Sequence, residues 1–130
     1  MMSSTVTPTA IHLHKASRTL ELQFADGQTY RLDAEYLRTH SPSAEVRGHG
    51  AGQTVLVFGK RAVAITDLQA IGQYAVKIVF DDGHDSGLFT WQYLYELGSD
   101  YDKNWSAYLA RLSGAGKSRE AEQSNLFKPA

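Results

Sequence analysis

The stretch "QYAVKIVFDDGHDSGLFTW", residues 73–91, decides the fold. Apolar residues recur at every second position up to Phe80, and the segment is rich in β-branched and aromatic side chains, which is typical of a half-buried strand. The polar run DDGH follows, with Asp82-Gly83 as a turn dipeptide, and a second apolar run then returns. The pattern predicts a β-hairpin with DDGH at its tip.

A second hairpin is predicted nearer the N-terminus. Its turn is Asp26-Gly27, where glycine supplies the positive φ that a tight turn requires. The flanking strands alternate with period two, through Ile11, Leu13, Leu20, Leu22, Phe24, Tyr30 and Leu32. The run "VLVFGKRAVAITDLQAIG", residues 55–72, predicts one or two further strands.

Three segments have the pattern of helices: residues 33–40, 91–97 and 100–112. Asp33 and Thr90 are the predicted N-caps, and Gly98 is predicted to end the second helix. Tyr36 and Leu37 of the first helix are predicted to face the core. The third helix has an apolar stripe formed by Trp105, Tyr108, Leu109 and Leu112. Together these elements predict an α+β fold, a mostly antiparallel sheet with short helices packed on one face in two layers.

Composition and charge narrow the function classes. The 130 residues suit one domain, predicted at residues 10–112 between a flexible leader, 1–9, and a disordered tail, 113–130. A net charge of −1 argues against nucleic acid or an anionic membrane as partner. The absence of cysteine excludes disulfides, thiol nucleophiles and thiolate metal sites. We expect a cytoplasmic protein without a secretory signal, either a monomer or a weak homo-oligomer.

The DDGH run has two interpretations. In the first it is only a turn, because Asp and Gly suit turn backbones and the polar groups are solvated there. In the second, His84 at the foot of the returning strand presents its imidazole to a metal or to acid–base chemistry. A single histidine in a turn does not decide between them.

The polar loop "SPSAEVRGHGAGQ", residues 41–53, is the second candidate. Together with the preceding His40, its residues Glu45 and His49 could chelate a transition metal, although their spacing matches no standard fingerprint. The alternative is a solvent-exposed connection. Long loops in compact domains are nonetheless often functional.

Three other patterns do not support a site. "SGAGKS", residues 113–118, is not a phosphate-binding loop, because Arg111 stands where the motif requires glycine and no strand leads into it. His12 and His14 share a strand face, which a polar surface explains. The aromatic residues near the C-terminus suggest a base-stacking platform, but helix packing explains them more simply.

Three stretches together resemble one known family: "IHLHKASRTLELQFADGQTYRLDAEYLR", "YLRTHSPSAEVRGH" and "IGQYAVKIVFDDGHDSGLFTWQYLYEL". They are similar to the gamma-butyrobetaine hydroxylase N-terminal-like domain in its small stand-alone bacterial form, a domain of unknown function. The resemblance covers about residues 8–98.

The resemblance implies a modified metal site. In larger relatives this domain precedes an iron- and 2-oxoglutarate-dependent oxygenase domain, and it binds zinc through three cysteines and the histidine of a DGH turn. His84 stands at that histidine position, whereas Ser41, Ser43 and Val46 stand at the cysteine positions. Valine cannot bind zinc, and a serine hydroxyl is a poor ligand compared with thiolate. Because the sequence carries no oxygenase domain, the resemblance also implies that the chain does not hydroxylate a substrate alone.

Three hypotheses follow. The leading one is a non-enzymatic adaptor that binds a protein partner, an iron–sulfur carrier or an oxygenase, through the 41–53 loop and the DDGH hairpin; the residues assigned to this surface are Ser41, Ser43, Arg47, Asp82 and Asp85. The second is a protein that binds iron or zinc, with the ligands His84, His40, Glu45 and His49. The third is a small-molecule enzyme with a cleft at DDGH, where Asp82 or Asp85 flanks His84.

Overall fold

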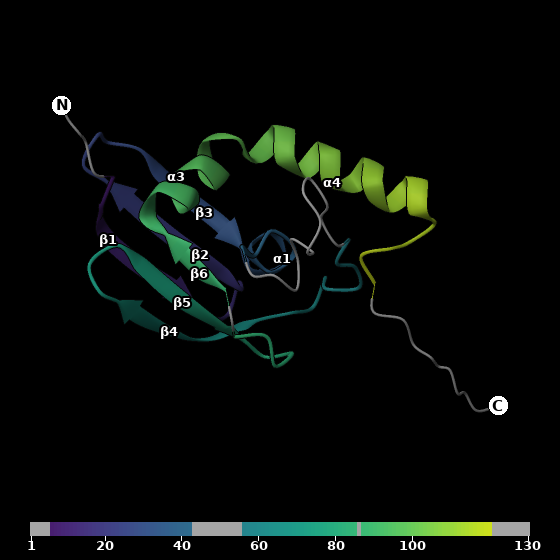
Figure 1. The fold of residues 1–130 in the computed structure, drawn as a ribbon, viewed down its shortest axis with the longest axis horizontal. Coiled ribbons are helices and arrows are strands. Elements are labelled where there is room, and N and C mark those ends of the chain that lie inside the picture. Colours follow the sequence, from purple (N-terminus) through teal and green to yellow (C-terminus); the bar gives the residue numbers. More distant parts are fainter. Residues whose placement is uncertain (1–5, 43–55, 86, 121–130) are drawn as a thin grey trace.

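The computed structural model describes residues 6–42, 56–85 and 87–120 (Figure 1). Within them lie two three-stranded sheets and three helices. The strands are β1 (Pro8–His14), β2 (Thr19–Phe24), β3 (Thr29–Asp33), β4 (Ile65–Ile71), β5 (Ala75–Phe80) and β6 (Leu88–Thr90). The helices are α1 (Ala34–Thr39), α3 (Trp91–Ser99) and α4 (Tyr101–Ala115).

The first sheet has the antiparallel order β1-β2-β3. Residues 20, 22 and 24 of β2 are buried and the residues between them are half-buried, so the period-two pattern does mark the core face. The turn before β3 is the predicted one: Gly27 has φ 91°, and its N–H donates to the Phe24 carbonyl at 3.0 Å.

The second sheet has the antiparallel order β4-β5-β6. In β5, Val76, Ile78 and Phe80 are buried, as predicted. Only the first half of β5 pairs with β6, because Ala75 lies opposite Thr90 and Lys77 lies opposite Leu88. The seven residues 81–87 therefore connect the end of β5 at Phe80 to the start of β6 at Leu88.

The α+β class is confirmed, but the strands form two sheets where a single one was predicted. Helix α3 contacts β3 of the first sheet and β6 of the second, so it joins them. Figure 1 shows α3 lying across the strands and α4 extending to one side of them. A single core forms where the sheets meet α1 and α3; its largest fully buried members are Tyr36, Phe80, Phe89, Leu20, Leu22, Leu32, Leu37, Ile78, Leu94 and Leu97.

Helices α1 and α3 begin directly after the residues that were predicted to cap them, Asp33 and Thr90. The Thr90 hydroxyl accepts a hydrogen bond from the Tyr93 N–H at 3.1 Å, a normal N-cap. Asp33 occupies the cap position of α1, but its side chain makes no capping hydrogen bond. In α4, Tyr108 and Leu112 are buried, whereas Leu109 is 40% exposed, so the predicted apolar stripe is wrong at Leu109.

Gly98 does not end its helix, contrary to the prediction, because α3 continues to Ser99. The structure gives another reason for glycine at this position. A β-carbon on Gly98 would collide with the ring of Tyr30, whose β3 strand packs against α3. Glycine therefore allows the helix and the strand to approach closely.

We predict that Gly98→Ala lowers the free energy of unfolding by about 1–3 kcal/mol, because the Tyr30 ring has to move out of a packed position. Gly114→Ala in α4 is the matched control, since nothing lies within 4 Å of the added methyl group. It should stabilise the protein by up to about 1 kcal/mol, as alanine favours helix. Urea unfolding of both variants measures the difference, and equal effects would contradict the packing argument.

The described fold extends past the predicted domain limits on both sides. Strand β1 begins at Pro8, and α4 runs to Ala115 before Gly116 ends it with φ 68°. The backbone carbonyls of Ser118 and Arg119 then accept hydrogen bonds from residues 59 and 61. Residues 113–120, which were predicted to belong to a disordered tail, are thus part of the fold. No helix in the described part of the chain is long and apolar enough to span a membrane.

Candidate functional site

The centre of the site is helix α1, which is buried over its whole length although it carries charges of both signs. Glu35 and Arg38 are each only 5% exposed. A buried charge is costly unless it is paired. The two side chains are paired with different distant segments: Glu35 with Arg119 near the C-terminus, and Arg38 with Asp82 in the DDGH turn. Helix α1 thereby holds both segments to the body of the protein.

Asp82 accepts from two cations and one backbone N–H. Its Oδ2 lies 2.8 Å from Arg38 Nε and 2.6 Å from Lys60 Nζ, and its Oδ1 accepts from the His84 N–H at 3.1 Å. Burial alone would raise the pKa of Asp82. The hydrogen bonds from Lys60, from the His84 backbone and from Arg38 outweigh this effect and lower the pKa to about 2. Asp82 therefore fixes the turn as a carboxylate.

This depressed pKa predicts a pH dependence. Because the folded pKa of Asp82 lies below the unfolded value, its contribution is complete above about pH 4 and is lost as the pH falls towards 2. Solvent screening reduces that contribution to about 1 kcal/mol. The free energy of unfolding of Asp82→Asn should therefore fall by about 1 kcal/mol less than that of the wild type between pH 5 and pH 2. Asp85→Asn, at an exposed carboxylate of the same turn, should keep the wild-type profile, and an identical profile for both variants would contradict the assignment.

His84 lies inside the protein and is only 5% exposed. Its ring Nε2 is 3.0 Å from Ser41 Oγ, which is also buried, and the ring packs near Phe80 with centroids 6.0 Å apart. The backbone closes the turn beneath it, since the His84 carbonyl accepts from the Phe80 N–H at 3.0 Å. Gly87 leaves room for the Ser41 hydroxyl, with which a β-carbon at residue 87 would collide. Glycine is thus required beside the Ser41–His84 pair.

Among the described residues, the contacts of His84 and His40 do not form a zinc or iron site of the kind that the resemblance implies; the predicted ligands Glu45 and His49 lie outside these residues. The Nε2 atom of His84 faces a serine hydroxyl, which is a poor metal ligand. The Nδ1 atom of His40 lies 2.9 Å from the Tyr36 carbonyl, and the His40 ring packs against Tyr36 and Tyr108. Residues 6–42, 56–85 and 87–120 contain no group of three side chains arranged to hold a metal ion.

His40 is a structural residue by its contacts. Burial lowers the pKa of its ring, an effect that the backbone hydrogen bond to Tyr36 partly opposes and that nearby Arg111 reinforces. The fold therefore favours the neutral imidazole. Because this folded pKa is depressed, the associated stability is present above about pH 6.5 and decreases as the pH falls below it.

The other residues that were predicted to form a site lie in different parts of the structure. Ser41 lies in the interior with His84 and not on a partner-binding surface as predicted. Asp82 has a side chain only 18% exposed, and Asp85 is exposed. The Asp82 carboxylate accepts a hydrogen bond from the backbone N–H of His84. Ser43, Glu45, Val46, Arg47 and His49 lie outside the described residues.

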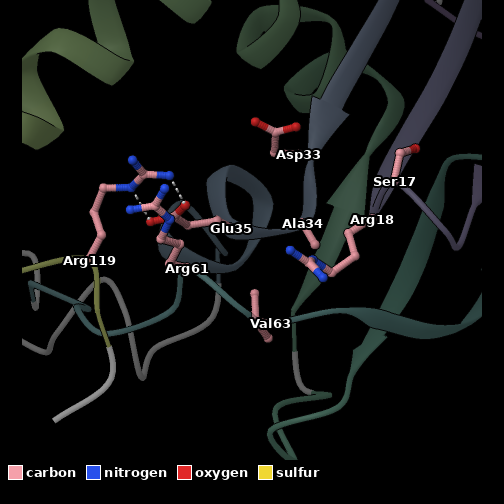
Figure 2. A pocket seen from close by; sticks show the side chains of 8 residues that line it. All are labelled: Ser17, Arg18, Asp33, Ala34, Glu35, Arg61, Val63 and Arg119. Atoms are coloured by element: carbon pink, nitrogen blue, oxygen red, sulfur yellow. Dashed lines mark hydrogen bonds and ion pairs between the residues drawn. The ribbon is translucent and has the colours of Figure 1, made fainter.

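Two of the pockets in the molecule are lined by described residues, and His84 lines neither of these two. The first, of about 180 Å³, lies against α1 (Figure 2); its lining includes Arg18, Asp33, Glu35, Arg61 and Arg119. The second, of about 430 Å³, is more apolar and lies between the first hairpin and α3, where it is lined by Val6, Phe24 and Tyr95.

Sequence reasoning missed the groups that organise the site: Glu35, Arg38, Lys60 and Arg119. Glu35 and Arg38 lie three residues apart in a predicted helix, a spacing that also suits an ordinary exposed ion pair. One feature of the sequence could have indicated that Glu35 and Arg38 are buried. The predicted helix is short and lies between a strand and a polar loop, so neighbouring segments can cover most of its surface.

Comparison with known proteins supports the same fold. The family model for gamma-butyrobetaine hydroxylase-like, N-terminal, matches residues 11–95. No curated protein matches the chain. One protein solved by NMR is 52% identical over 98% of this chain and 100% of its own, with a TM-score of 0.81. A second is 47% identical over 100% of this chain and 94% of its own, with a TM-score of 0.78.

A crystal structure from Acidithiobacillus ferrooxidans ATCC 23270 is also similar. That protein, of unknown function and of the DUF971 family, is 38% identical over 71% of this chain and 92% of its own, with a TM-score of 0.60. The match to the family model spans well over half of the chain and includes the DDGH turn and α1. The chain therefore belongs to the gamma-butyrobetaine hydroxylase-like N-terminal family.

Proposed function

We propose that this chain is a non-enzymatic adaptor domain that binds a protein partner through the DDGH turn and the adjoining 41–53 segment. The observation that carries the proposal is the way in which the turn is held. The side chains of Asp82 and His84 are anchored by Arg38, Lys60 and Ser41, while Asp81 before them and Asp85 after them are exposed. The loop that follows β5 projects beyond the strands (Figure 1).

A turn held in this way suits docking. Ordering a loop on binding costs free energy, and a turn already fixed by Arg38, Lys60 and Ser41 avoids that cost. Arg38 and Lys60 exceed the charge of Asp82 by one. With the exposed Asp81, whose Oδ1 accepts from the Ala64 N–H at 3.1 Å, and the exposed Asp85, the five groups carry a net charge of −1. A partner surface bearing Lys or Arg would complement them and be steered towards them.

The partner class is inferred from the family. The resemblance to the module that precedes the oxygenase domain in larger relatives supports a partner in oxygenase chemistry, and an iron–sulfur carrier is the other candidate partner. The link is by association, since a shared domain does not by itself transfer a function. The alternative, iron or zinc bound by His84 with His40, Glu45 or His49, has the weaker support, because His84 and His40 are both engaged by other groups.

Site-specific photocrosslinking tests the docking surface. A crosslinking residue replaces Asp85 in one sample and Asp67, an exposed carboxylate on β4, in the matched control. We expect a discrete crosslinked partner from position 85 and none from position 67. With the purified partner, Asp85→Arg should weaken binding by about tenfold or more while Asp67→Arg leaves it unchanged. Equal crosslinking from both positions, or none from 85, would overturn the proposal.

A further inference from the structure

The segment Lys117–Glu120, which we call the C-terminal strap, lies along residues 59–61 like an added strand of peptide. The N–H of Gly59 donates to the Ser118 carbonyl, and the N–H of Arg61 donates to the Arg119 carbonyl, both at 3.0 Å. Main-chain pairing of this kind is the usual way in which proteins bind extended peptides. The strap thus occupies a peptide-binding geometry within its own chain.

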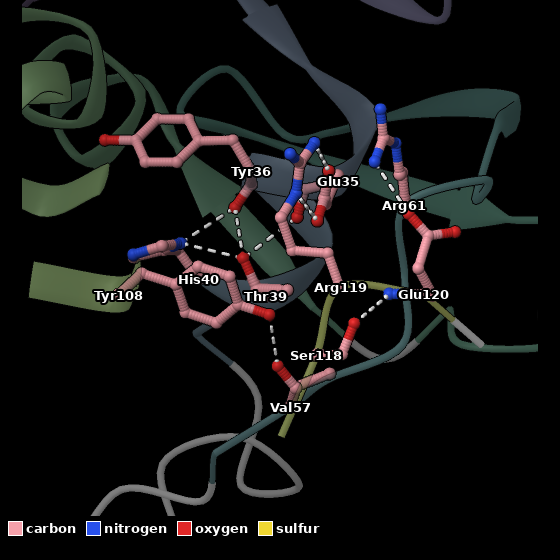
Figure 3. Close-up of polar contacts among 10 residues, drawn as sticks. All are labelled: Glu35, Tyr36, Thr39, His40, Val57, Arg61, Tyr108, Ser118, Arg119 and Glu120. Carbon is pink, nitrogen blue, oxygen red and sulfur yellow. Dashed lines mark hydrogen bonds and ion pairs between the residues drawn. The ribbon is translucent and has the colours of Figure 1, made fainter. Parts of the chain in front are cut away.

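One side chain anchors the strap. The Nε and Nη2 atoms of Arg119 lie 2.8 and 2.7 Å from the two carboxylate oxygens of Glu35 (Figure 3). The guanidinium also lies over the Trp105 ring, 5.2 Å from its centroid. A buried carboxylate beside an aromatic face selects the planar fork of arginine over the point charge of lysine. The groove is built for a guanidinium group.

The remaining strap contacts are peripheral. Lys117 Nζ lies 4.6 Å from the centre of the Phe58 ring, and Arg61 pairs with Glu120 at 2.6 Å. The Arg61 and Glu120 side chains are 57% and 64% exposed, and surface pairs of this kind contribute little. Specificity at this groove therefore rests on Arg119, while the two main-chain hydrogen bonds contribute affinity.

Apart from Arg119, the strap buries little of its surface. Residues 117, 118 and 120 are exposed, and the segment follows Gly116, whose left-handed φ of 68° ends α4. Segments with few buried apolar contacts open at a lower free energy than the fold as a whole. Opening would leave Glu35 as a buried carboxylate without Arg119, a state that favours capture of another guanidinium.

We propose that the groove formed by Glu35, Trp105 and residues 59–61 binds an extended, arginine-bearing segment of a partner protein, and that the C-terminal strap is its resident intramolecular ligand. A second copy of this chain is the less favoured occupant. Exchange of identical straps between two copies gains no contact that each copy lacks alone, whereas a foreign segment can add contacts outside the groove. The groove is distinct from the DDGH turn, so the two proposals can fail separately.

The test uses full-length Arg119→Ala, which empties the guanidinium position. The probe is a blocked synthetic peptide of residues 113–120, SGAGKSRE, and the readout is the Gly59 and Arg61 amide signals in NMR spectra. We expect saturable binding about tenfold or more tighter than to the wild type, in which the strap competes. The matched peptide with alanine in place of arginine should bind about tenfold more weakly.

The control is full-length Arg31→Ala, which removes an exposed arginine on β3 and leaves Arg119 in the groove; it should resemble the wild type. No binding to folded Arg119→Ala, or equal binding of the two peptides, would overturn the proposal. A strap-exchanged dimer of the wild type in sedimentation experiments would also overturn it, in favour of a second copy as the occupant.

A measurement on the wild type alone keeps the proposal testable if Arg119→Ala does not fold. Hydrogen exchange should show the Gly59 and Arg61 amides opening far more readily than the amides of β5, because only the strap protects them. Exchange of these two amides at the rate of global unfolding would show that the strap does not leave the groove, and the proposal would then be wrong.

Discussion

His84→Ala should lower the free energy of unfolding by about 2–4 kcal/mol. The substitution removes a buried ring that packs near Phe80 and breaks the hydrogen bond to Ser41, so a cavity and a lost polar contact add together. Urea denaturation measures the loss. His12→Ala, on an exposed position of β1, is the control and should change the unfolding free energy by less than about 0.5 kcal/mol.

A second variant disturbs the hydrogen bond between Ser41 and His84 by acting on Ser41. Gly87→Ala places a methyl group against the Ser41 hydroxyl and forces it away from His84, so it should destabilise the protein by about 1–3 kcal/mol. If His84→Ala had no more effect than His12→Ala, the imidazole would not be a structural group, and its assignment to the interior would be wrong.

Arg119→Ala should cost about 2–3 kcal/mol, although the residue lies within the predicted disordered tail. The variant leaves the Glu35 carboxylate buried without its bidentate partner, and removing one member of a buried ion pair is strongly destabilising. The side chain of Arg119 is 35% exposed, which keeps the expected loss below that of a fully buried pair. Thermal or urea unfolding measures it.

Two further variants isolate the pair. Arg61→Ala removes an arginine of the same surface whose partner Glu120 is exposed, and it should cost less than about 0.5 kcal/mol. Glu35→Gln combined with Arg119→Ala should be less destabilised than the sum of the single changes, because neutral Gln needs no counter-ion. Strict additivity of the two changes would contradict a direct interaction between them.

The local elements were largely predictable from the sequence. Both hairpins follow from alternation interrupted by Asp26-Gly27 and by Asp82-Gly83, since period two and turn chemistry are encoded over a few residues. The helix starts at Ala34 and Trp91 follow in the same way from the residues before them. Such signals do not depend on what the rest of the chain does.

The contacts between distant segments were not predictable. Glu35 and Arg119 are 84 residues apart, and Arg38 and Asp82 are 44 apart, so no local pattern connects them. Arg119 was placed in a disordered tail because the sequence around it is polar and aperiodic. Its role depends on a buried partner that only the folded chain brings near.

The position of His84 shows the same limit. A histidine in a polar turn is equally compatible with exposure and with burial, and the decision depends on Ser41, which arrives from another part of the chain. Gly98 is a related case: its position near a helix end suggested a stop, whereas its close contact with Tyr30 depends on the packing of α3 on β3. Tertiary contacts, and not propensity, fix both residues.

The most direct test of the account is NMR of the His84 ring nitrogens in untagged protein as Zn²⁺ or Fe²⁺ is added. If the imidazole is bound to Ser41 in the interior and the turn serves docking, the His84 Nε2 signal should stay unchanged at equimolar metal. A stoichiometric shift of that signal, lost in His84→Ala, would show that the turn holds a metal ion and would contradict the account.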